Sequence, residues 1–571
     1  MPSLQARVGR TDGRRQLPVF LQLPGLQKTH QTQTGRLLRV LFLWNGSLPA
    51  NSASPRSRKG DLLHLTTRRQ AVSPWAMKLS CKPGVAAVVV MLILSGCASV
   101  PPDLGRSDVD ALVAERGQGA SAAVSAEASA ELLASLTGEP LTPESAIRIA
   151  LLNNPQLAAT YATLGFGAAD VYQAGRIRNP VFSASVLNSS LAFEQDQITF
   201  GLAASFTDLI TLSARKRLSA GAFSALKQSI GDKVLHVTAE TAVSYYRYVS
   251  AQQVAALRRQ TARAAELSAR LAERYFKAGN INSRELAMQQ AEASEARLTA
   301  LEADAAAFAA RTSLATLLGL SVGASWTAPS QLLLPPGGED DLASVLELAR
   351  KSRLDLASAT TQADVLADRL GVVNWTRWLG ELDLGVETER EPDGGRLTGP
   401  TLSWEIPIFN SKRDDVLRAS AEMQIAVAEV RRLAIAVDND VRLAYAELQN
   451  ARARVEEYRD ELIPRRIEAV AQAQREVSYM LIGVFELISL KRQEYEAYQG
   501  YLESVRDYWV RRVALSLAAG NEVPAVVQEK PTVIDVQEFV APNEPVMDHS
   551  MHGSMNHETS KDQVEDNGDT P

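Results

Sequence analysis

Cysteine is nearly absent from this sequence. Its 571 residues include only Cys81 and Cys97, which both lie near the N-terminus. The body of the chain therefore has no cysteine for a disulfide framework or a cysteine-based metal site. Aromatic residues are sparse at 6 %, and alanine is abundant. This composition is typical of long helices and unlike that of compact α/β enzymes.

The sequence also lacks the motifs of catalysis. It has no Ser-His-Asp arrangement, phosphate-binding loop or zinc-binding helix motif. Its acidic residues are spread along the expected helices as solvated charges. We therefore predict a protein that is not an enzyme and requires no cofactor, so that the energy for its work comes from a partner. The six histidines are His30, His64, His236, His549, His552 and His557.

Residues 1–76 are strongly basic, with 12 lysines or arginines and 2 acidic residues. A basic arm that binds nucleic acid is one interpretation. We favour another, in which this stretch is an upstream extension or a disordered segment outside the mature protein, because a complete secretion signal follows it. No nucleic-acid partner is then expected.

A secretory signal peptide is predicted at residues 77–96. Met77 provides a start, Lys78 and Lys82 give it positive charge, and Val85–Leu94 is an unbroken apolar run. This run is too short for a membrane-spanning helix, which needs about 20 residues. No long apolar run follows in the rest of the chain.

The four residues that end this segment, Leu94-Ser-Gly-Cys97, resemble the lipobox of bacterial lipoproteins. The resemblance implies that Cys97 becomes the mature N-terminus and carries lipid such as palmitate. Because Ala98 rather than aspartate follows, it also implies an anchor in the outer membrane. The alternative is an ordinary buried cysteine. Residues 97–140 are rich in Ala, Ser, Gly and Pro, and we predict a lipidated tether there.

The body is a duplicated unit, predicted at 141–339 and 340–520. Similar sequences occur at Ala146–Leu157 and Val345–Leu356. A second pair runs from Tyr275 to Gly279 and from Tyr479 to Gly483, and a Glu-Leu pair follows each. Two similarities in the same order indicate an internal repeat.

Each copy is predicted to contain a long helix. Arg215–Tyr275 and Arg413–Tyr479 contain no proline except Pro464, so each could extend on the order of 90 Å. Apolar residues recur at helical spacing in both. The stripe of the second copy is Val430, Leu433, Val437, Val441, Ala444 and Leu448, and that of the first is Leu257, Ala264, Leu267 and Leu271. A plain coiled coil is the alternative.

Short alternating segments beside these helices favour β-strands over a coiled coil. Glu381–Glu387 and Thr401–Ile406 alternate apolar and polar residues, and Pro392-Asp-Gly-Gly395 between them is a turn sequence. Phe182–Val186 and Thr199–Phe206 are the counterparts in the first copy. Polar faces suit a water-filled lumen and apolar faces suit lipid. Surface hairpins of a soluble protein are the alternative. Four strands cannot close a wide barrel, since bacterial barrels start at about eight strands, so oligomerisation is required.

Three sequences in this order resemble the TolC-type outer-membrane efflux family. They are Leu141–Pro155, Ala174–Pro180 and Ile406–Asn410. The resemblance implies a mainly α fold with a small β part. Duplicated helical hairpins would form a trimeric α-barrel, and four strands per chain would contribute to a twelve-strand outer-membrane β-barrel. It also implies two partners, a periplasmic adaptor (membrane fusion protein) and an inner-membrane RND-type pump.

The same resemblance places the two helix–helix turns at the periplasmic tip, where the family meets its adaptor. Tyr275 and Gly279 would mark the first turn, and Tyr479 and Gly483 the second. In some members acidic residues after the second turn close the aperture, and Glu486 matches one such position. A solvated surface charge is the alternative.

The C-terminal segment, residues 521–571, is predicted to be a flexible tail with a methionine- and histidine-rich stretch. Thioether sulfur suits Cu(I) and Ag(I), and imidazole binds several transition metals. A chance cluster in a polar tail is the alternative. The stretch contains Met547, His549, Met551, His552, Met555 and His557.

These patterns together predict the passive outer-membrane channel of a tripartite efflux system. It would be lipid-anchored with a long periplasmic portion, and its cargo would be copper, silver or other heavy-metal ions. Two alternatives stay open. The same channel could export drugs or other organic compounds, or the chain could be a helical lipoprotein without a pore that scaffolds partners or buffers metal.

Overall fold

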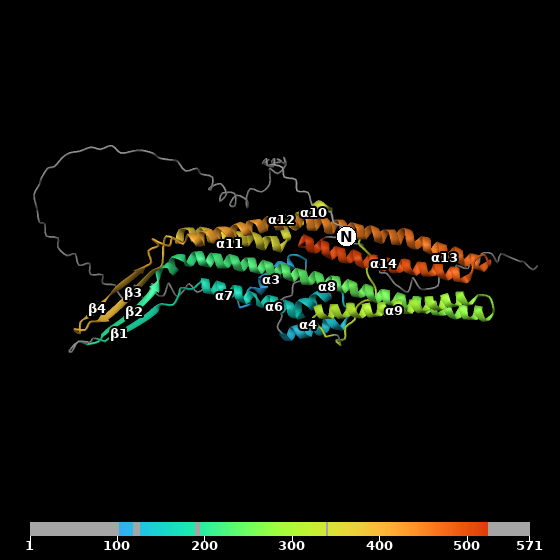
Figure 1. The fold of residues 1–571 in the computed structure, drawn as a ribbon, viewed down its shortest axis with the longest axis horizontal. Helices are drawn as coiled ribbons and strands as arrows, with labels where there is room; N and C mark the ends of the chain where they lie inside the picture. Colours follow the sequence, from blue (N-terminus) through green and yellow to red (C-terminus); the bar gives the residue numbers. More distant parts are fainter. Residues whose placement is uncertain (1–101, 118–125, 189–194, 322, 339–340, 524–571) are drawn as a thin grey trace, which may run out of the picture. The chain divides into compact units, whose positions relative to one another are not determined.

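A computed structural model describes residues 102–117, 126–188, 195–321, 323–338 and 341–523. The chain divides into two units, Met1–Lys82 and Pro83–Pro571, and all the described residues lie in the second. Within that unit the strands gather at one end, and the turns between paired long helices lie at the other (Figure 1).

The first copy of the repeat runs from short helices through a β-hairpin to a long helical hairpin. Its first two helices begin at prolines that follow polar caps, because Thr142 and Asn154 accept hydrogen bonds from the main-chain N–H groups of the first turns. The elements are α5 (Pro143–Asn153), α6 (Pro155–Ala162), α7 (Leu164–Ala174), β1 (Val181–Leu187), β2 (Gln197–Ser205), α8 (Phe206–Lys277) and α9 (Ser283–Leu317).

The second copy repeats this order, with one helix in place of α6 and α7. Its first element takes the place of α5 and its last element takes the place of α9, at nearly the same separation along the chain. The elements are α10 (Leu342–Ser352), α11 (Leu354–Thr376), β3 (Leu382–Arg390), β4 (Arg396–Trp404), α12 (Arg413–Glu456), η1 (Glu457–Leu462), α13 (Ile463–Ser478) and α14 (Val484–Ala519).

Both predicted long helices are present. The first, α8, is a single helix of 72 residues. The second is interrupted by the π-helical turn η1, directly before Pro464 in the first turn of α13. Proline has no N–H and its ring clashes with the carbonyl four residues earlier. A wider π-helical turn accommodates this without ending the helix.

The predicted apolar stripe of the second copy is buried from Val437 onward, and its first two members are half-buried. Val437, Val441 and Leu448 are fully covered, and they belong to the same core cluster as Leu502 and Val505 of α14. This cluster also includes residues of α5, α8, α9 and α10, so the core holds the two copies together.

The stripe predicted for the first copy is only partly confirmed, because Leu271 is half-buried and two of its members are exposed. Leu257 is buried, whereas Ala264 and Leu267 are exposed. Here α8 packs closely against α9 through small residues, and the Ser268 hydroxyl donates a hydrogen bond to Gln289 Oε1 at 2.7 Å. Leucines therefore do not mark the buried face. The buried positions of α8 beyond Leu257 are Ala262, Ser268 and Ala272.

The segment predicted as a tether, residues 97–140, is structured in part. It contains α3 (Arg106–Ala114) and α4 (Ala126–Gly138). Helix α3 packs on α8, where Val109 and Val113 belong to a buried cluster with Ile230. The helical spacing of these two valines is too short a signal to distinguish a packed helix from a linker.

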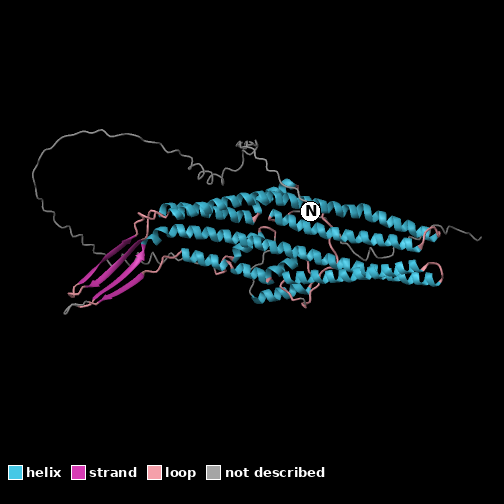
Figure 2. Cartoon of the chain, in the orientation of Figure 1, coloured by secondary structure: helices cyan, strands magenta, loops and turns pink. Residues whose placement is uncertain are grey.

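The four strands form one antiparallel sheet in the order β1-β2-β3-β4 (Figure 2). The sheet therefore joins the hairpin of the first copy to that of the second through β2 and β3. The predicted strands are confirmed, although β4 begins earlier than expected and ends before Ile406, and Phe206 already belongs to α8. Among the described residues, no helix combines the length and apolar character needed to cross a membrane.

Candidate functional site

The sheet has one apolar face and one polar face. Across its strands Phe182 is paired with Leu202, Leu202 with Val386, and Leu384 with Leu402. These side chains are exposed in the single chain, and the Phe182 ring stacks on Phe200 with centroids 6.2 Å apart. The opposite face of the same strands carries Ser183, Thr199, Asp383, Glu387, Thr401 and Ser403.

A buried carboxylate fixes the junction between α7 and the first hairpin. Asp208, in the first turn of α8, is 4 % exposed. Arg178 donates two hydrogen bonds to this carboxylate, from Nε to Oδ2 at 2.9 Å and from Nη2 to Oδ1 at 3.2 Å. Arg215 Nη2 lies 3.7 Å from Oδ1. These hydrogen bonds from Arg178 hold the pKa of Asp208 below its usual value. This charge pair thereby ties the segment before β1 to the first turn of α8.

The first helix–helix turn has the predicted glycine. Gly279 has φ +78°, in the left-handed region, directly after the end of α8. The Asn280 N–H donates to the Tyr275 carbonyl at 2.9 Å, which closes the turn as in a Schellman motif. Asn282 then caps α9 by accepting a hydrogen bond from the Glu285 N–H at 3.0 Å. Tyr275 itself packs edge-to-face on Phe485 of α14.

The second turn corrects the assignment of Gly483. Gly483 is extended, with φ −80° and ψ 150°, and it is the residue before α14. The left-handed position belongs instead to Met480, with φ +59°. The Leu481 N–H donates to the Glu476 carbonyl at 2.9 Å, so the turn closes in the same way as the first. The structural counterpart of Gly279 is therefore Met480, and the two glycines that the sequence comparison aligned are not equivalent.

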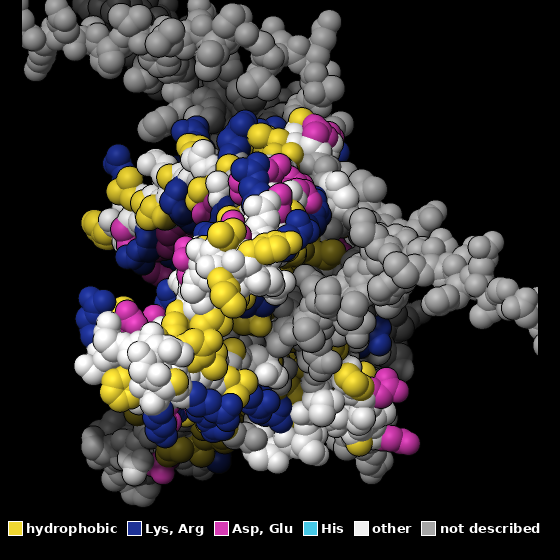
Figure 3. All heavy atoms as spheres, turned by 90° about the vertical axis from the view of Figure 1, so that its right-hand side faces the viewer, with side chains coloured by type: hydrophobic (Ala, Val, Ile, Leu, Met, Phe, Trp, Pro, Cys, Tyr) yellow, Lys and Arg dark blue, Asp and Glu magenta, His cyan; other side chains and the backbone are white. Residues whose placement is uncertain are grey.

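This end of the unit is rich in exposed apolar side chains. Tyr479, Met480 and Leu481 are 77 %, 93 % and 72 % exposed, respectively. Figure 3 faces this end and shows hydrophobic side chains beside those of lysine and arginine. Single exposed apolar residues are ordinary, whereas three in succession form a small exposed apolar patch at this turn.

Glu486 lies in the first turn of α14 and is exposed. Its counterpart Glu285 accepts a hydrogen bond from Asn282 Nδ2 at 3.2 Å, whereas Glu486 follows Gly483, which has no side chain to donate. Within the described part of the chain, Glu486 has no ion-pair partner. The aperture role of Glu486 stays a prediction.

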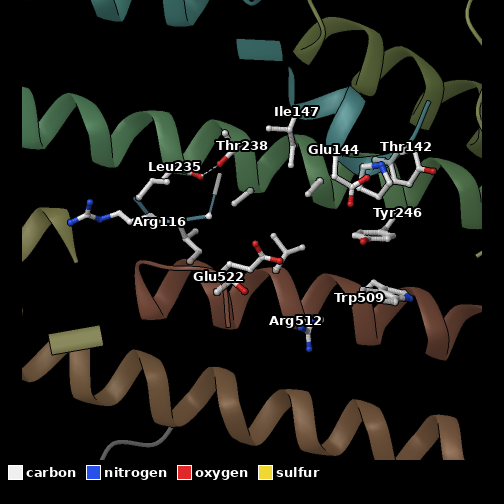
Figure 4. A pocket seen from close by; sticks show the side chains of 18 of the residues that line it. Arg116, Thr142, Glu144, Ile147, Leu235, Thr238, Tyr246, Trp509, Arg512 and Glu522 are labelled. Atoms are coloured by element: carbon white, nitrogen blue, oxygen red, sulfur yellow. Dashed lines mark hydrogen bonds between the residues drawn. The ribbon is translucent and has the colours of Figure 1, made fainter. Parts of the chain in front are cut away.

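A cavity of about 850 Å³ lies among α5, α8 and α14. Figure 4 shows the rings of Tyr246 and Trp509 side by side, with centroids 5.2 Å apart, and Glu144 and Arg512 on the lining. Burial raises the pKa of Tyr246, so its phenol stays neutral. None of the predicted site residues lines this cavity.

The lipid and metal assignments lie outside the described residues. Cys97 and the stretch from Met547 to His557 belong to segments that the structure does not describe. Among residues that it does describe, no group of three or more His, Cys, Asp or Glu side chains is placed to hold a metal ion.

The sequence analysis did not identify a second set of residues, which bond to the ends of the return helices α9 and α14, away from the helix–helix turns. The Asn154 side chain donates to the Leu317 carbonyl, and Gly319 follows with φ +67°. In the second copy Arg353 donates to the Ala518 carbonyl, and Gly520 follows with φ +65°. The signal in the sequence was a glycine directly after each return helix.

The fold is shared with known outer-membrane channels. VceC from Vibrio cholerae has 16 % identity, a TM-score of 0.56, and coverage of 66 % of this chain and 96 % of its own. The CmeC outer membrane channel of Campylobacter jejuni has 16 % identity, a TM-score of 0.55, and coverage of 72 % and 88 %. Protein CyaE of Bordetella pertussis is 27 % identical over 332 residues, which cover 54 % of this chain and 69 % of CyaE.

With a two-faced sheet at one end and duplicated helical hairpins beside it, the chain has the fold of the TolC-type outer-membrane channels. Residues 146–320 match the family described as outer membrane efflux protein. The family consists of passive channels rather than enzymes, in agreement with the prediction from the sequence.

Proposed function

We propose that this chain is the outer-membrane channel of a tripartite efflux system, that three copies form the conduit, and that monovalent copper or silver is its cargo. The observation that carries the channel part is the sheet. Its apolar face is exposed, and β1 and β4 each have one edge without a neighbour among the described strands. Exposed sheet edges invite pairing with another chain.

Pairing of β4 with β1 of the next copy would continue the sheet. Three copies contribute twelve strands, which exceeds the roughly eight that the smallest bacterial barrels need. The apolar face then meets lipid, and the polar face with Asp383 and Glu387 meets water. Size-exclusion chromatography with light scattering in detergent tests the trimer, and conductance across a planar bilayer tests the pore. A monomer without conductance would instead favour a helical scaffold lipoprotein.

The support for a metal cargo is the composition of the tail. Three methionines and three histidines lie between residues 547 and 557. Sulfur and imidazole ligands suit Cu(I) and Ag(I). The tail would be an open site for transient capture rather than a rigid cage.

The decisive experiment is copper and silver tolerance in a strain deleted for this gene. The deletion is complemented with the full chain, with a chain truncated after Pro545, or with a chain of full length in which the tail methionines become leucine and its histidines become glutamine. Loss of tolerance on deletion supports metal efflux. If only the full chain restores it, the tail ligands matter. Unchanged metal tolerance with raised drug sensitivity supports export of organic compounds instead.

We further propose a lipid anchor on Cys97, based on the preceding Leu-Ser-Gly sequence. Mass spectrometry of the protein from membranes should find a mature N-terminus at Cys97 with attached acyl chains. Replacement of Cys97 by serine should leave an unprocessed chain. An acylated terminus elsewhere, or an intact Met1, contradicts the proposal.

A further inference from the structure

Three exposed tryptophans lie where the second copy changes between helix and strand. Trp375 lies in the last turn of α11, Trp378 follows this helix by two residues, and Trp404 is the last residue of β4. All three are exposed, Trp378 by 60 %. Trp404 Nε1 donates to the Leu379 carbonyl at 3.0 Å, so the strand end is fixed to the end of the helix. The equivalent junction of the first copy has no tryptophan.

Beside these tryptophans lies Arg377, which pairs with no carboxylate in the part of the chain that the structure describes. The Arg377 guanidinium lies 4.8 Å from the centre of the Trp378 ring. Its Nε is buried without a hydrogen-bond partner, and among the described residues Arg377 has no ion pair. Arg178 holds the equivalent position when the starts of α5 and α10 are aligned, and it bonds to the buried Asp208. The first turn of α12 also carries acidic residues, Asp414 and Asp415, but among the described residues neither forms an ion pair with Arg377.

Phospholipid headgroups would provide a phosphate for Arg377 and an interfacial environment for the tryptophans. Tryptophan prefers the membrane–water interface, where its ring meets hydrocarbon and its polar edge meets water. The guanidinium of arginine matches the geometry of a phosphate. Trp404 also continues the apolar face of the sheet, since it is paired with Leu382. The surface therefore lies at the border between a lipid-facing sheet and a hydrated helical body.

We propose that Trp375, Arg377, Trp378 and Trp404, together called the junction cluster, sit in the phospholipid headgroup layer beside the helices, with Arg377 bound to a lipid phosphate. This inference rests on the proposed membrane channel and adds which residues set its depth. The first copy contributes a smaller pair of the same kind, in which Arg176 lies 4.0 Å from the centre of the Tyr172 ring.

Tryptophan quenching in vesicles tests the position of the cluster. Full-length proteins with one tryptophan each, the others replaced by phenylalanine, are reconstituted in phosphatidylcholine vesicles. The lipids carry bromine either near the headgroup or near the end of the acyl chain. Trp326 serves as the matched control, because it is 3 % exposed and packed between Arg311 and Tyr248 in the helical body.

We expect bromine near the headgroup to quench Trp375 and Trp378 at least twofold more than bromine at the chain end does. Trp404 should be quenched by brominated lipid, and Trp326 should be quenched by neither of the two brominated lipids. If Trp404 is quenched but Trp375 and Trp378 behave like Trp326, the junction cluster is wrong while the membrane channel stands. If none of the tryptophans is quenched in vesicles, the channel proposal fails as well.

The role of Arg377 is tested by comparison with its equivalent. Arg178→Gln should lower the thermal unfolding midpoint both in detergent without phosphate groups and in vesicles, because its partner Asp208 is internal. Arg377→Gln should lower the midpoint in vesicles by several degrees and leave it unchanged in that detergent. Equal effects of Arg377→Gln in the two media, or no effect in either, would overturn the assignment of a lipid phosphate.

Discussion

Asn154 and Arg353 perform the same task in the two copies with different chemistry. Asn154 Nδ2 donates to the Leu317 carbonyl at 2.9 Å, and Arg353 Nη1 donates to the Ala518 carbonyl at 3.3 Å. Each bond ties the bend between two early helices to the end of the return helix of its hairpin. Arg353 also bridges Asp355 and Asp440, so the second copy holds this bend with charge where the first uses an amide cap.

The glycine after each return helix should be intolerant of any side chain. Gly319 has φ +67°, and a Cβ there would lie 2.2 Å from the Asn153 carbonyl oxygen. Left-handed backbone costs a non-glycine residue about 1–2 kcal/mol, and the contact adds to it. Gly319→Ala should therefore lower the free energy of unfolding by more than about 2 kcal/mol, measured by thermal or denaturant unfolding in detergent.

Gly371→Ala provides the control for this prediction. Gly371 lies within α11, and no atom lies within 4 Å of the place of its missing Cβ. Alanine is the better helix former by about 1 kcal/mol, so this variant should be as stable as the natural chain or more so. Equal stability of the Gly319 and Gly371 variants would show that the bend of the first copy tolerates a side chain.

The Asp208 pair should contribute stability only at pH values where the carboxylate is charged. Because the pKa of Asp208 is lowered in the folded chain, its contribution is present above the ordinary value of 3.8 and is lost as the pH falls through the lower, folded value. Asp208→Asn should cost about 2 kcal/mol at neutral pH, the typical value of a charged hydrogen bond. Unfolding midpoints measured against pH should converge with those of the natural chain in acid.

Asp368→Asn is the matched control for the charge itself. Asp368 pairs with Arg217 at 3.3 Å, but both side chains are largely exposed, so their pairing contributes about 1 kcal/mol at most. This variant should be close to the natural chain at every pH. A loss at Asp208 that persists unchanged in acid would instead point to packing rather than to the carboxylate charge.

Alternation and periodicity were sufficient to predict the strands and the long helices, because the apolar residues that mark them recur over many turns or pairs. Three features escaped the same reasoning. The buried face of α8 near the tip consists of alanine and serine, which no hydropathy pattern reports. The turn at Met480 adopts a glycine conformation without glycine, so the nearby Gly483 was mistaken for it. Asp208 is buried only because Arg178, 30 positions earlier, folds back onto it.

The two faces of the sheet should respond differently to charge. Leu402 and Ser403 are neighbours in β4 and point to opposite faces. A positive charge on a lipid-facing position costs about 2–4 kcal/mol at the middle of a bilayer. Leu402→Arg should therefore reduce the amount of heat-resistant trimer recovered from membranes severalfold, whereas Ser403→Arg, opposite Asp383, should not. Equal losses would argue that neither face meets lipid.

Met480 should matter for assembly and not for folding. Its left-handed backbone favours glycine, so Met480→Gly should leave the unfolding midpoint unchanged or raise the stability by about 1 kcal/mol. Its side chain is also the most exposed of the three at the second turn, and nothing within the described part of the chain accounts for an apolar group held there at a cost. Contact with the periplasmic adaptor would account for it.

Met480→Gly should then fail to restore export in the deletion strain although it folds and reaches the membrane in normal amounts. Gly279→Ala should show the reverse pattern, with a lowered midpoint of unfolding and export that follows the amount of folded protein. Full complementation by Met480→Gly would remove this side chain from the adaptor contact.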